Sequence, residues 1–283
     1  MLKAIALVEN KDGCGLLGEH GLSVYIEYQG KKILLDMGTT DLYAKNSGAL
    51  SVDLSSVDLA VLSHAHYDHS GGLENFCQIN MKAPIYLQRA CKENCYRQAS
   101  FGKKYIGIPE GFLEKCKSRL VFVHGDCALA PGVWIVGHHM KNMEEKGEAA
   151  GMYRLEDGRM IPDDFSHEQS LVFETDKGLV IFNSCCHGGP ADILAEVRDR
   201  PSFQGKNIYA LIGGFHLKDI LKVPEEDRSQ AREIIENLGR KLKGSGCARF
   251  YTGHCTGETG FTWLKEMLGE RLEYFGTGDE IDI

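Results

Sequence analysis

The stretch Ser63-His64-Ala65-His66-Tyr67-Asp68-His69-Ser70-Gly71-Gly72-Leu73 places four side chains that can bind metal within six residues. Imidazole nitrogens suit zinc, iron and manganese, and a carboxylate adds an anionic ligand. In an extended segment His64 and His66 point to the same side, so both can bind one ion. Asp68 and His69 follow, where a turn or helix start can direct them to a second ion. A histidine-rich surface loop is the alternative, but it fits poorly with a position between an apolar strand and two glycines.

The residues before this cluster read as strands. Residues 57–63 are mostly apolar and predict a buried strand that leads directly into the histidines. Residues 22–28 and 32–36 flank a Gln29-Gly30 turn and predict a β-hairpin. Asp36 ends the hairpin, and we expect it to orient metal-binding histidines by accepting a hydrogen bond from the ring nitrogen that does not bind metal.

The rest of the chain alternates strand and helix patterns. We predict strands over 120–123, 133–136, 170–175, 178–182, 208–213 and 248–252, and helices over about 224–243 and 261–272. Residues 89–117 have a mixed, partly helical pattern, and residues 141–164 read as an exposed excursion. These patterns predict two sheets flanked by helices. We expect a single domain over residues 1–283, with an insertion at about 89–164 that shapes a substrate pocket.

Composition excludes several classes of protein. The 283 residues carry a net charge of −8, and their basic runs are short and interleaved, which disfavours a nucleic-acid partner. No apolar run is long enough for a transmembrane helix, and the apolar run at residues 4–8 is too short for a signal peptide. We therefore expect a cytoplasmic protein without a membrane partner. Its ten cysteines are then reduced thiols, most of them packed in the core.

Several motifs together resemble a known family. His64-x-His66-x-Asp68-His69 after an apolar strand is similar to the metal-binding motif of the metallo-β-lactamase superfamily, and Leu35-Asp36-Met37-Gly38 resembles the turn that precedes it. Five further motifs resemble the branch of 7,8-dihydropterin-6-methyl-4-(β-D-ribofuranosyl)aminobenzene-5′-phosphate synthases. They are Glu19-His20-Gly21-Leu22-Ser23, His167-Glu168-Gln169-Ser170, Cys186-His187-Gly188-Gly189, Gly213-Gly214-Phe215-His216-Leu217 and His254-Cys255-Thr256-Gly257. The resemblance extends over essentially the whole chain.

The resemblance implies a fold and a set of ligands. The fold is α/β (α+β), a four-layer αββα sandwich, with one or two metal ions at one edge of its sheets. Zinc is the expected metal, with iron or manganese as alternatives. The implied ligands of the first ion are His64, His66 and His187, and those of the second are Asp68, His69 and His254.

Other polar residues have more open roles. Asp68 is also expected to act in catalysis by accepting a proton from metal-activated water. His216 ends a strand beside two glycines, where it either contacts substrate or forms ordinary loop hydrogen bonds. His167 could replace His187 as a ligand, and His20 could line the mouth of the site.

The resemblance has one gap. Many members of the superfamily have a bridging aspartate near residues 184–186, but this sequence reads Asn183-Ser184-Cys185-Cys186-His187 and offers no carboxylate there. Either the second ion is weakly held or a thiolate from Cys185 or Cys186 replaces the carboxylate. Alternatively, both cysteines are small packing residues. The sequence thus leaves open whether one or two ions are bound.

Three enzymatic functions remain. The first is a metal-dependent hydrolase that uses activated water on a phosphoester, ester or lactam in a small molecule, phosphorylated or not. The second is the synthase reaction of the branch named above, which is a transfer reaction. The third is a di-iron redox protein. A metal-binding module without catalytic activity is disfavoured by the complete ligand set. The sequence contains no serine-nucleophile, P-loop or dinucleotide motif, and the oligomeric state is left open.

Overall fold

The computed structural model describes residues 1–221 and 228–283. Its chain divides into two compact units. The first comprises Met1–Cys127, Gly137–Gln169 and Gly276–Ile283, and the second comprises Ala128–Val136 and Ser170–Phe275. Among the described residues, we find no helix with the length and apolar character that a membrane span requires.

A seven-stranded sheet in the order β18-β1-β2-β3-β4-β5-β8 organises the first unit. Its strands are β1 (Leu2–Val8), β2 (Ser23–Tyr28), β3 (Lys31–Leu35), β4 (Leu59–Val61), β5 (Ile85–Gln88), β8 (Leu120–Val123) and β18 (Glu280–Asp282). The predicted hairpin is confirmed, because β2 and β3 are antiparallel, with Tyr25 opposite Leu34. Gln29 and Gly30 both have positive φ, as a two-residue hairpin turn requires. From β3 to β8 all neighbouring strands are parallel.

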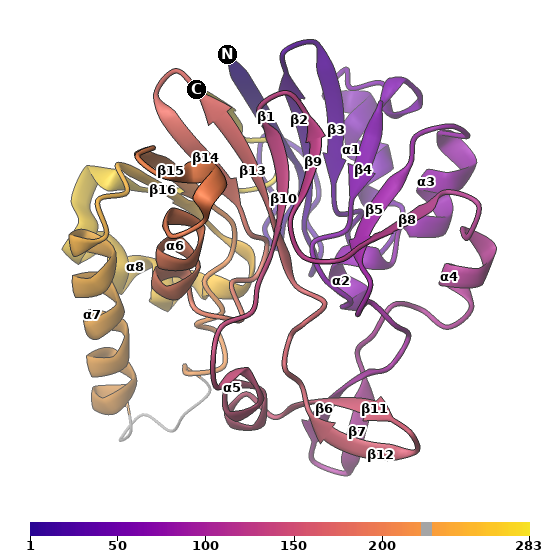
Figure 1. Cartoon of the computed structure of the whole chain (residues 1–283). Helices are drawn as coiled ribbons and strands as arrows, with labels where there is room; N and C mark the ends of the chain where they lie inside the picture. The colour runs from indigo at the N-terminus through magenta and orange to yellow at the C-terminus, as the bar shows by residue number, and fades with distance from the viewer. Residues whose placement is uncertain (222–227) are drawn as a thin grey trace. The chain divides into compact units, whose positions relative to one another are not determined.

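Helices cover one face of this sheet. They are α1 (Leu42–Ala49), α3 (Leu73–Ile79) and the short α4 (Phe112–Lys115), with a 3₁₀ turn at Leu54–Ser56 (Figure 1). Tyr43 of α1 and Phe76 of α3 are fully buried and belong to one apolar cluster with Leu7 and Leu34 of the sheet. Burial of these large side chains is what attaches the helices to the sheet.

A second, smaller sheet in the first unit has the order β12-β11-β6-β7. Its strands are β6 (Cys95–Ala99), β7 (Gly102–Tyr105), β11 (Met152–Glu156) and β12 (Arg159–Pro162), and α5 (Met143–Ala149) precedes β11. The helical character expected for residues 89–117 is therefore mostly wrong, since β6 and β7 occupy much of this range. Tyr96 and Tyr105 lie opposite each other with ring centroids 5.2 Å apart, a pairing that favours strands here.

The second unit is built on a seven-stranded sheet in the order β17-β16-β15-β14-β13-β10-β9. Its strands are β9 (Cys127–Ala130), β10 (Val133–Gly137), β13 (Gln169–Thr175), β14 (Gly178–Phe182), β15 (Ile208–Ile212), β16 (Arg249–Thr252) and β17 (Leu272–Tyr274). These confirm the strands predicted from the sequence. The four strands from β14 to β17 run parallel to one another.

Three helices accompany the second sheet, α6 (Pro190–Arg198), α7 (Arg228–Gly244) and α8 (Gly257–Leu268) (Figure 1). The predicted helix 261–272 exists but begins and ends four residues earlier. The other predicted helix extends through Gly244 rather than ending before it. Its predicted start at residue 224 lies outside the described residues.

Candidate metal centre

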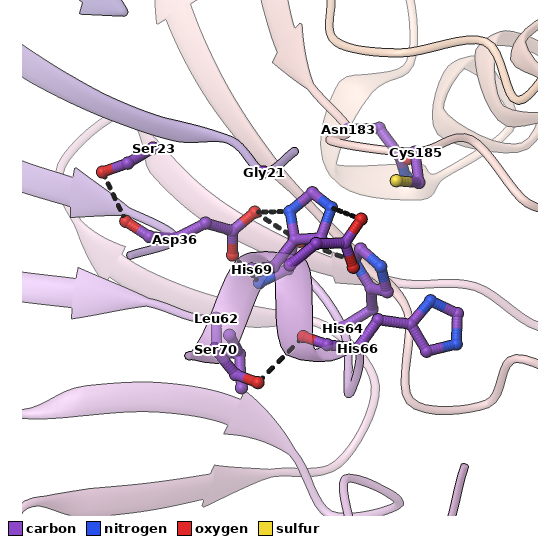
Figure 2. Close-up of polar contacts among 12 residues, drawn as sticks. Gly21, Ser23, Asp36, Leu62, His64, His66, His69, Ser70, Asn183 and Cys185 are labelled. Carbon is purple, nitrogen blue, oxygen red and sulfur yellow. Dashed lines mark hydrogen bonds and ion pairs between the residues drawn. The ribbon is translucent and has the colours of Figure 1, made fainter. Parts of the chain in front are cut away.

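The first unit carries four of the predicted ligands in one short stretch. His66 is the last extended residue, with φ −97° and ψ 149°, and α2 (Tyr67–Ser70) begins immediately after it. Asp68 and His69 therefore lie in a helical turn, as predicted, and His64 lies in the extended part. All four side chains are buried. Ser70 donates a 2.8 Å hydrogen bond to the carbonyl of His66, which holds this turn (Figure 2).

Asp36 holds the histidines of this stretch through hydrogen bonds. Its carboxylate accepts hydrogen bonds at 2.7 Å from Nδ1 of His69 and at 2.6 Å from the hydroxyl of Ser63 (Figure 2 shows the contact with His69). The backbone N–H of Ser63 donates to the other carboxylate oxygen at 2.7 Å. Asp36 is fully buried and has a left-handed backbone with φ 59°. The predicted hydrogen bond from a histidine ring to Asp36 is thus present.

These contacts decide which ring nitrogens face a metal. The hydroxyl of Ser63 donates to Asp36, so it accepts from Nδ1 of His64, which lies 2.8 Å away. Both His64 and His69 therefore carry their proton on Nδ1, and each directs Nε2 toward the ligand cluster. A carboxylate behind the imidazole is the arrangement that fixes the tautomer of metal-binding histidines.

The donor set of the first unit fits a metal ion. Potential ligand atoms of His64, Asp68 and His69 all lie within 4.8 Å of one another. The ring of His64 is 4.2 Å from that of His69 and 4.7 Å from that of His66, measured between centroids. Neutral imidazoles and one carboxylate at this spacing match the ligands of zinc and its neighbours.

Asp68 has a second polar neighbour in the same unit. Nε2 of His20 lies 3.4 Å from its carboxylate, and the side chain of His20 is half exposed. Glu19 has a different task, because its carboxylate accepts the backbone N–H groups of Thr39 and Thr40 at 2.9 and 3.0 Å. His20 therefore contacts the candidate ligand, while Glu19 holds the turn after β3.

Gly71 and Gly72 are needed because another part of the backbone lies very close to them. Gly71 is in the right-handed helical region and Gly72 also has a negative φ. A Cβ on Gly71 would lie 2.0 Å from the carbonyl oxygen of Thr39, and one on Gly72 would lie 2.2 Å from that of Met37. Only glycine allows the loop after β3, which contains Asp36, to approach the ligand helix this closely.

The second unit presents its histidines at one edge of its sheet. His187, His216 and His254 follow β14, β15 and β16, three neighbouring parallel strands. Loops at the carboxyl ends of parallel strands gather at one edge, where α/β proteins build their sites. The second unit thus supplies the two remaining predicted ligands, His187 and His254, beside His216.

Backbone strain marks the same loops. Cys186, His216 and His254 all have φ values between 49° and 50°. Residues other than glycine adopt this left-handed conformation at a cost of roughly 1–3 kcal/mol, and such residues cluster at functional sites. Sequence patterns gave no sign of this strain.

His216 contacts both a predicted ligand and a carboxylate. Its ring centroid lies 4.6 Å from that of His187, and its Nε2 lies 3.4 Å from the carboxylate of Asp219. Its backbone N–H points to the sulfur of Cys255 at 3.3 Å. Burial lowers the pKa of His216, but Asp219 and Cys255 raise it more, to about 10. Asp219 and Cys255 thus favour the protonated form of His216, which lies beside His187.

The two adjacent cysteines have different surroundings. The sulfur of Cys186 points to the carbonyl of Asn183 at 3.5 Å, so it belongs to the loop's own backbone contacts. The sulfur of Cys185 lies within 4.8 Å of a ring nitrogen of His187 and of one of His254. Of the two thiols, Cys185 is the one beside predicted ligands.

Comparisons with known proteins identify the family of this chain. Residues 17–162 match the model of the metallo-β-lactamase superfamily. A 7,8-dihydropterin-6-methyl-4-(β-D-ribofuranosyl)-aminobenzene-5′-phosphate synthase of Methanocaldococcus jannaschii is 32% identical over 92% of this chain and 88% of its own. An uncharacterized protein of the same organism is 25% identical over 75% of this chain and 78% of its own.

Solved structures show the same fold. Tm1679, described as a metal-dependent hydrolase of the β-lactamase superfamily, is 23% identical and has a TM-score of 0.81 over 100% of this chain and 99% of its own. A diphosphatase of the PhnP family is 15% identical and has a TM-score of 0.53 over 100% of this chain and 98% of its own. The predicted fold class is therefore confirmed. The chain belongs to the metallo-β-lactamase superfamily, in a branch that resembles the dihydropterin-ribosylaminobenzene phosphate synthases.

Proposed function

We propose that this protein is a metal-dependent hydrolase that uses metal-activated water on a phosphoester, ester or lactam in a small molecule. The observation that carries the proposal is the carboxylate of Asp36, which sets the tautomer of His69 directly and that of His64 through Ser63. A protein that merely buried these histidines would have no need to direct two Nε2 atoms at one cluster. Membership of an enzyme superfamily whose members bind metal supports it further.

The proposed ligand set is the one that the sequence predicts. His64, His66 and His187 bind the first ion, and Asp68, His69 and His254 bind the second. Zinc is the proposed metal, with iron or manganese as alternatives. We propose that Cys185 would supply a thiolate ligand where the carboxylate is missing, because its sulfur is close to ring nitrogens of both His187 and His254.

The chain's own residues have distinct roles in the proposed reaction. When bound, the metal lowers the pKa of water toward neutrality and polarises the substrate oxygen. Asp68 accepts the proton from the attacking water. The ring of His20, with Nε2 3.4 Å from the carboxylate of Asp68, helps to hold that carboxylate in place. His216 contacts the substrate, since its ring lies beside that of His187, with 4.6 Å between the centroids.

The substrate pocket is proposed to involve the segment 89–164. A cavity of about 510 Å³ in the first unit is lined by His138, His139, Met140, Asn142, Met143, Glu144, Glu145, Asp164 and Ser166. Of the two histidines in this lining, His138 is buried and His139 is exposed. We propose a small-molecule substrate, no nucleic-acid or membrane partner, and a cytoplasmic location.

The synthase reaction is a second candidate. Its support is the relative from Methanocaldococcus jannaschii, which is 32% identical over nearly the whole chain and carries that name. Both candidates need the same metal ligands, so the ligand geometry does not separate them. They differ in whether water or a second organic substrate completes the reaction.

Two measurements test the proposal. The protein is purified without added metal or chelator, and its metal content per chain is measured by elemental mass spectrometry. About two equivalents of zinc support the proposed centre, mostly iron would favour the redox alternative, and no metal after reconstitution would contradict it. The zinc protein is then assayed on chromogenic phosphodiesters, esters and lactams, with Asp68→Asn as the inactive control. Formation of a dihydropterin conjugate without any hydrolysis would instead establish the synthase reaction.

A further inference from the structure

One sequence motif, His167-Glu168-Gln169-Ser170, has no role in the site described above. It lies at the start of β13, and the segment from Asp163 to Gln169 belongs to the first unit. The side chains of Asp163, His167 and Gln169 are polar and at most 3% exposed. Buried polar groups are hydrogen-bonded, so their partners show what the segment does.

His167 binds the backbone between two predicted ligands. The N–H of Ala65, which lies between His64 and His66, donates to Nδ1 of His167 at 3.2 Å. A ring nitrogen that accepts an N–H carries no proton, so the ring carries a proton on Nε2. Nε2 lies 3.2 Å from the carboxylate of Asp163 and donates to it.

Asp163 is itself held in place. Its other carboxylate oxygen accepts the N–H of Phe165 at 2.9 Å. A Cβ on Gly147 of α5 would lie 2.1 Å from the carbonyl oxygen of Asp163, so α5 is in close contact with this backbone. The ring of His167 is therefore fixed at both nitrogens and cannot turn without breaking a buried hydrogen bond.

Gln169 makes a second connection to the same strand end. Its N–H donates to the carbonyl of Ser63 at 2.8 Å, and its side-chain amide donates to the carbonyl of Leu62 at 2.8 Å. The side-chain oxygen of Gln169 accepts from Gln88 at 2.9 Å. Residues 62–65 are thus held by Asp163–Gln169 as well as by Asp36.

A metal site at His167 is the competing interpretation. Potential ligand atoms of His66, Cys95, Asp163 and His167 all lie within 4.8 Å of one another, and zinc binds such residues. Nε2 of His167 could bind a metal only if its proton moved to Nδ1. There the proton would face the N–H of Ala65, so two donors would point at each other. The contacts therefore favour hydrogen bonding over metal binding at this ring.

We propose that His167, anchored by Asp163, is a positioning residue that sets the backbone of His64-Ala65-His66 for metal binding. The inference rests on the proposed metal centre, since it concerns two of its ligands. Loss of a group that orients a metal ligand typically weakens metal affinity by about 10- to 100-fold. We expect this loss of metal affinity when the hydrogen bond from the N–H of Ala65 to Nδ1 of His167 is removed.

Two isosteric variants separate the bonds of His167. In His167→Asn the amide oxygen occupies the place of Nδ1 and can still accept the N–H of Ala65. In His167→Gln the amide reaches Asp163, but no acceptor faces Ala65. Zinc affinity is measured by competition with a chromophoric chelator. We expect His167→Gln to weaken it by about 10- to 100-fold, and His167→Asn by less than a third of that factor. His124→Asn, an exposed histidine in the same unit, is the control.

Amide exchange in the metal-free protein gives a second readout. The N–H of Ala65 should exchange slowly in the wild type and in His167→Asn, and faster in His167→Gln. Equal zinc affinity in both variants, or faster exchange in both, would overturn the proposal. Loss of one whole zinc equivalent in His167→Asn would show that His167 is a ligand and would also overturn it. If His167→Gln does not fold, Asp163→Asn is used in its place. Unchanged zinc affinity in Asp163→Asn would contradict the role of Asp163 in holding His167.

This design separates the two proposals. If the wild type binds no zinc, the proposed function fails, and the exchange rates of Ala65 still report whether His167 holds the backbone. If zinc binds normally and the exchange rates do not follow the pattern above, only the positioning role fails.

Discussion

At the scale of single residues, the buried carboxylate of Asp36 accepts several hydrogen bonds at once. It accepts hydrogen bonds from His69 and from both the backbone and the hydroxyl of Ser63. In Asp36→Asn the amide has one acceptor oxygen and is uncharged, so it cannot satisfy all three donors. We expect zinc affinity to fall by about 10- to 100-fold, as measured by chelator competition.

The control for this variant is Asp58→Asn. Asp58 accepts the N–H of Lys32 at 2.9 Å near the start of β4, far along the strand from the ligands. It should leave zinc affinity unchanged. Equal losses in the two variants would mean that Asp36 acts through general stability rather than through the histidines.

Cys185 and Cys186 form a natural pair of test and control. Only Cys185 has its sulfur beside ring nitrogens of His187 and His254, whereas the sulfur of Cys186 contacts the carbonyl of Asn183. In the cobalt-substituted protein a bound thiolate gives a charge-transfer absorption in the near ultraviolet. We expect this band to disappear in Cys185→Ser and to persist in Cys186→Ser. Its absence from the wild-type spectrum would rule out a thiolate ligand.

The candidate ligands could be predicted at this scale, but the contacts that position them could not. His64, His66, Asp68 and His69 are close together in the sequence, so their spacing alone indicated metal binding. Ala65 and His167, in contrast, are 102 positions apart, and no local pattern connects them. The choice between Cys185 and Cys186 depends on loop conformation, which the sequence does not reveal.

At the scale of elements, the site depends on loops that approach each other closely. Gly213, after β15, has φ 141°, and a Cβ there would lie 1.9 Å from the carbonyl oxygen of Asn183, after β14. Gly213→Ala should therefore destabilise the protein by about 2–4 kcal/mol, from backbone strain and collision together. Urea unfolding of the metal-free protein measures this change.

Gly205→Ala is the matched control for the collision. Gly205 also has a positive φ, 79°, but its Cβ would meet no atom within 4 Å. We expect only the strain component, about 1 kcal/mol. A Gly213→Ala variant no less stable than Gly205→Ala would contradict the close packing of the loops after β14 and β15.

Sequence patterns predicted most of the strands but missed the smaller sheet. The central strands of the two large sheets are mostly apolar runs, and their burial leaves a clear signal. β6 and β11, by contrast, contain many polar residues. They pair although more than fifty residues separate them in the sequence, with Tyr96 opposite Tyr153. Long-range pairing of this kind cannot be deduced from a local pattern.

At the scale of the whole molecule, metal binding should contribute to stability. A ligand that binds only the folded state stabilises it by about 2.7 kcal/mol at a hundred times its Kd. For a chain of this size, that raises Tm by about 5 °C. We expect dialysis against a chelator to lower Tm by at least this amount and zinc to restore it, measured by calorimetry. An unchanged Tm in a protein shown to have lost its zinc would contradict preferential binding of zinc to the folded state.

The pairing of β18 with β1 has a consequence for how the chain is made. Leu2 and Ile283 exchange two backbone hydrogen bonds, at 2.7 and 2.8 Å, and Figure 1 draws the two ends side by side. A ribosome makes β1 long before residues 276–283, so the first sheet keeps an open edge at β1 until those residues have been made. Such an edge can pair with another chain, which makes a nascent chain prone to aggregation. A circular permutant that joins the two ends through a short linker would close this edge early and should refold with less aggregation.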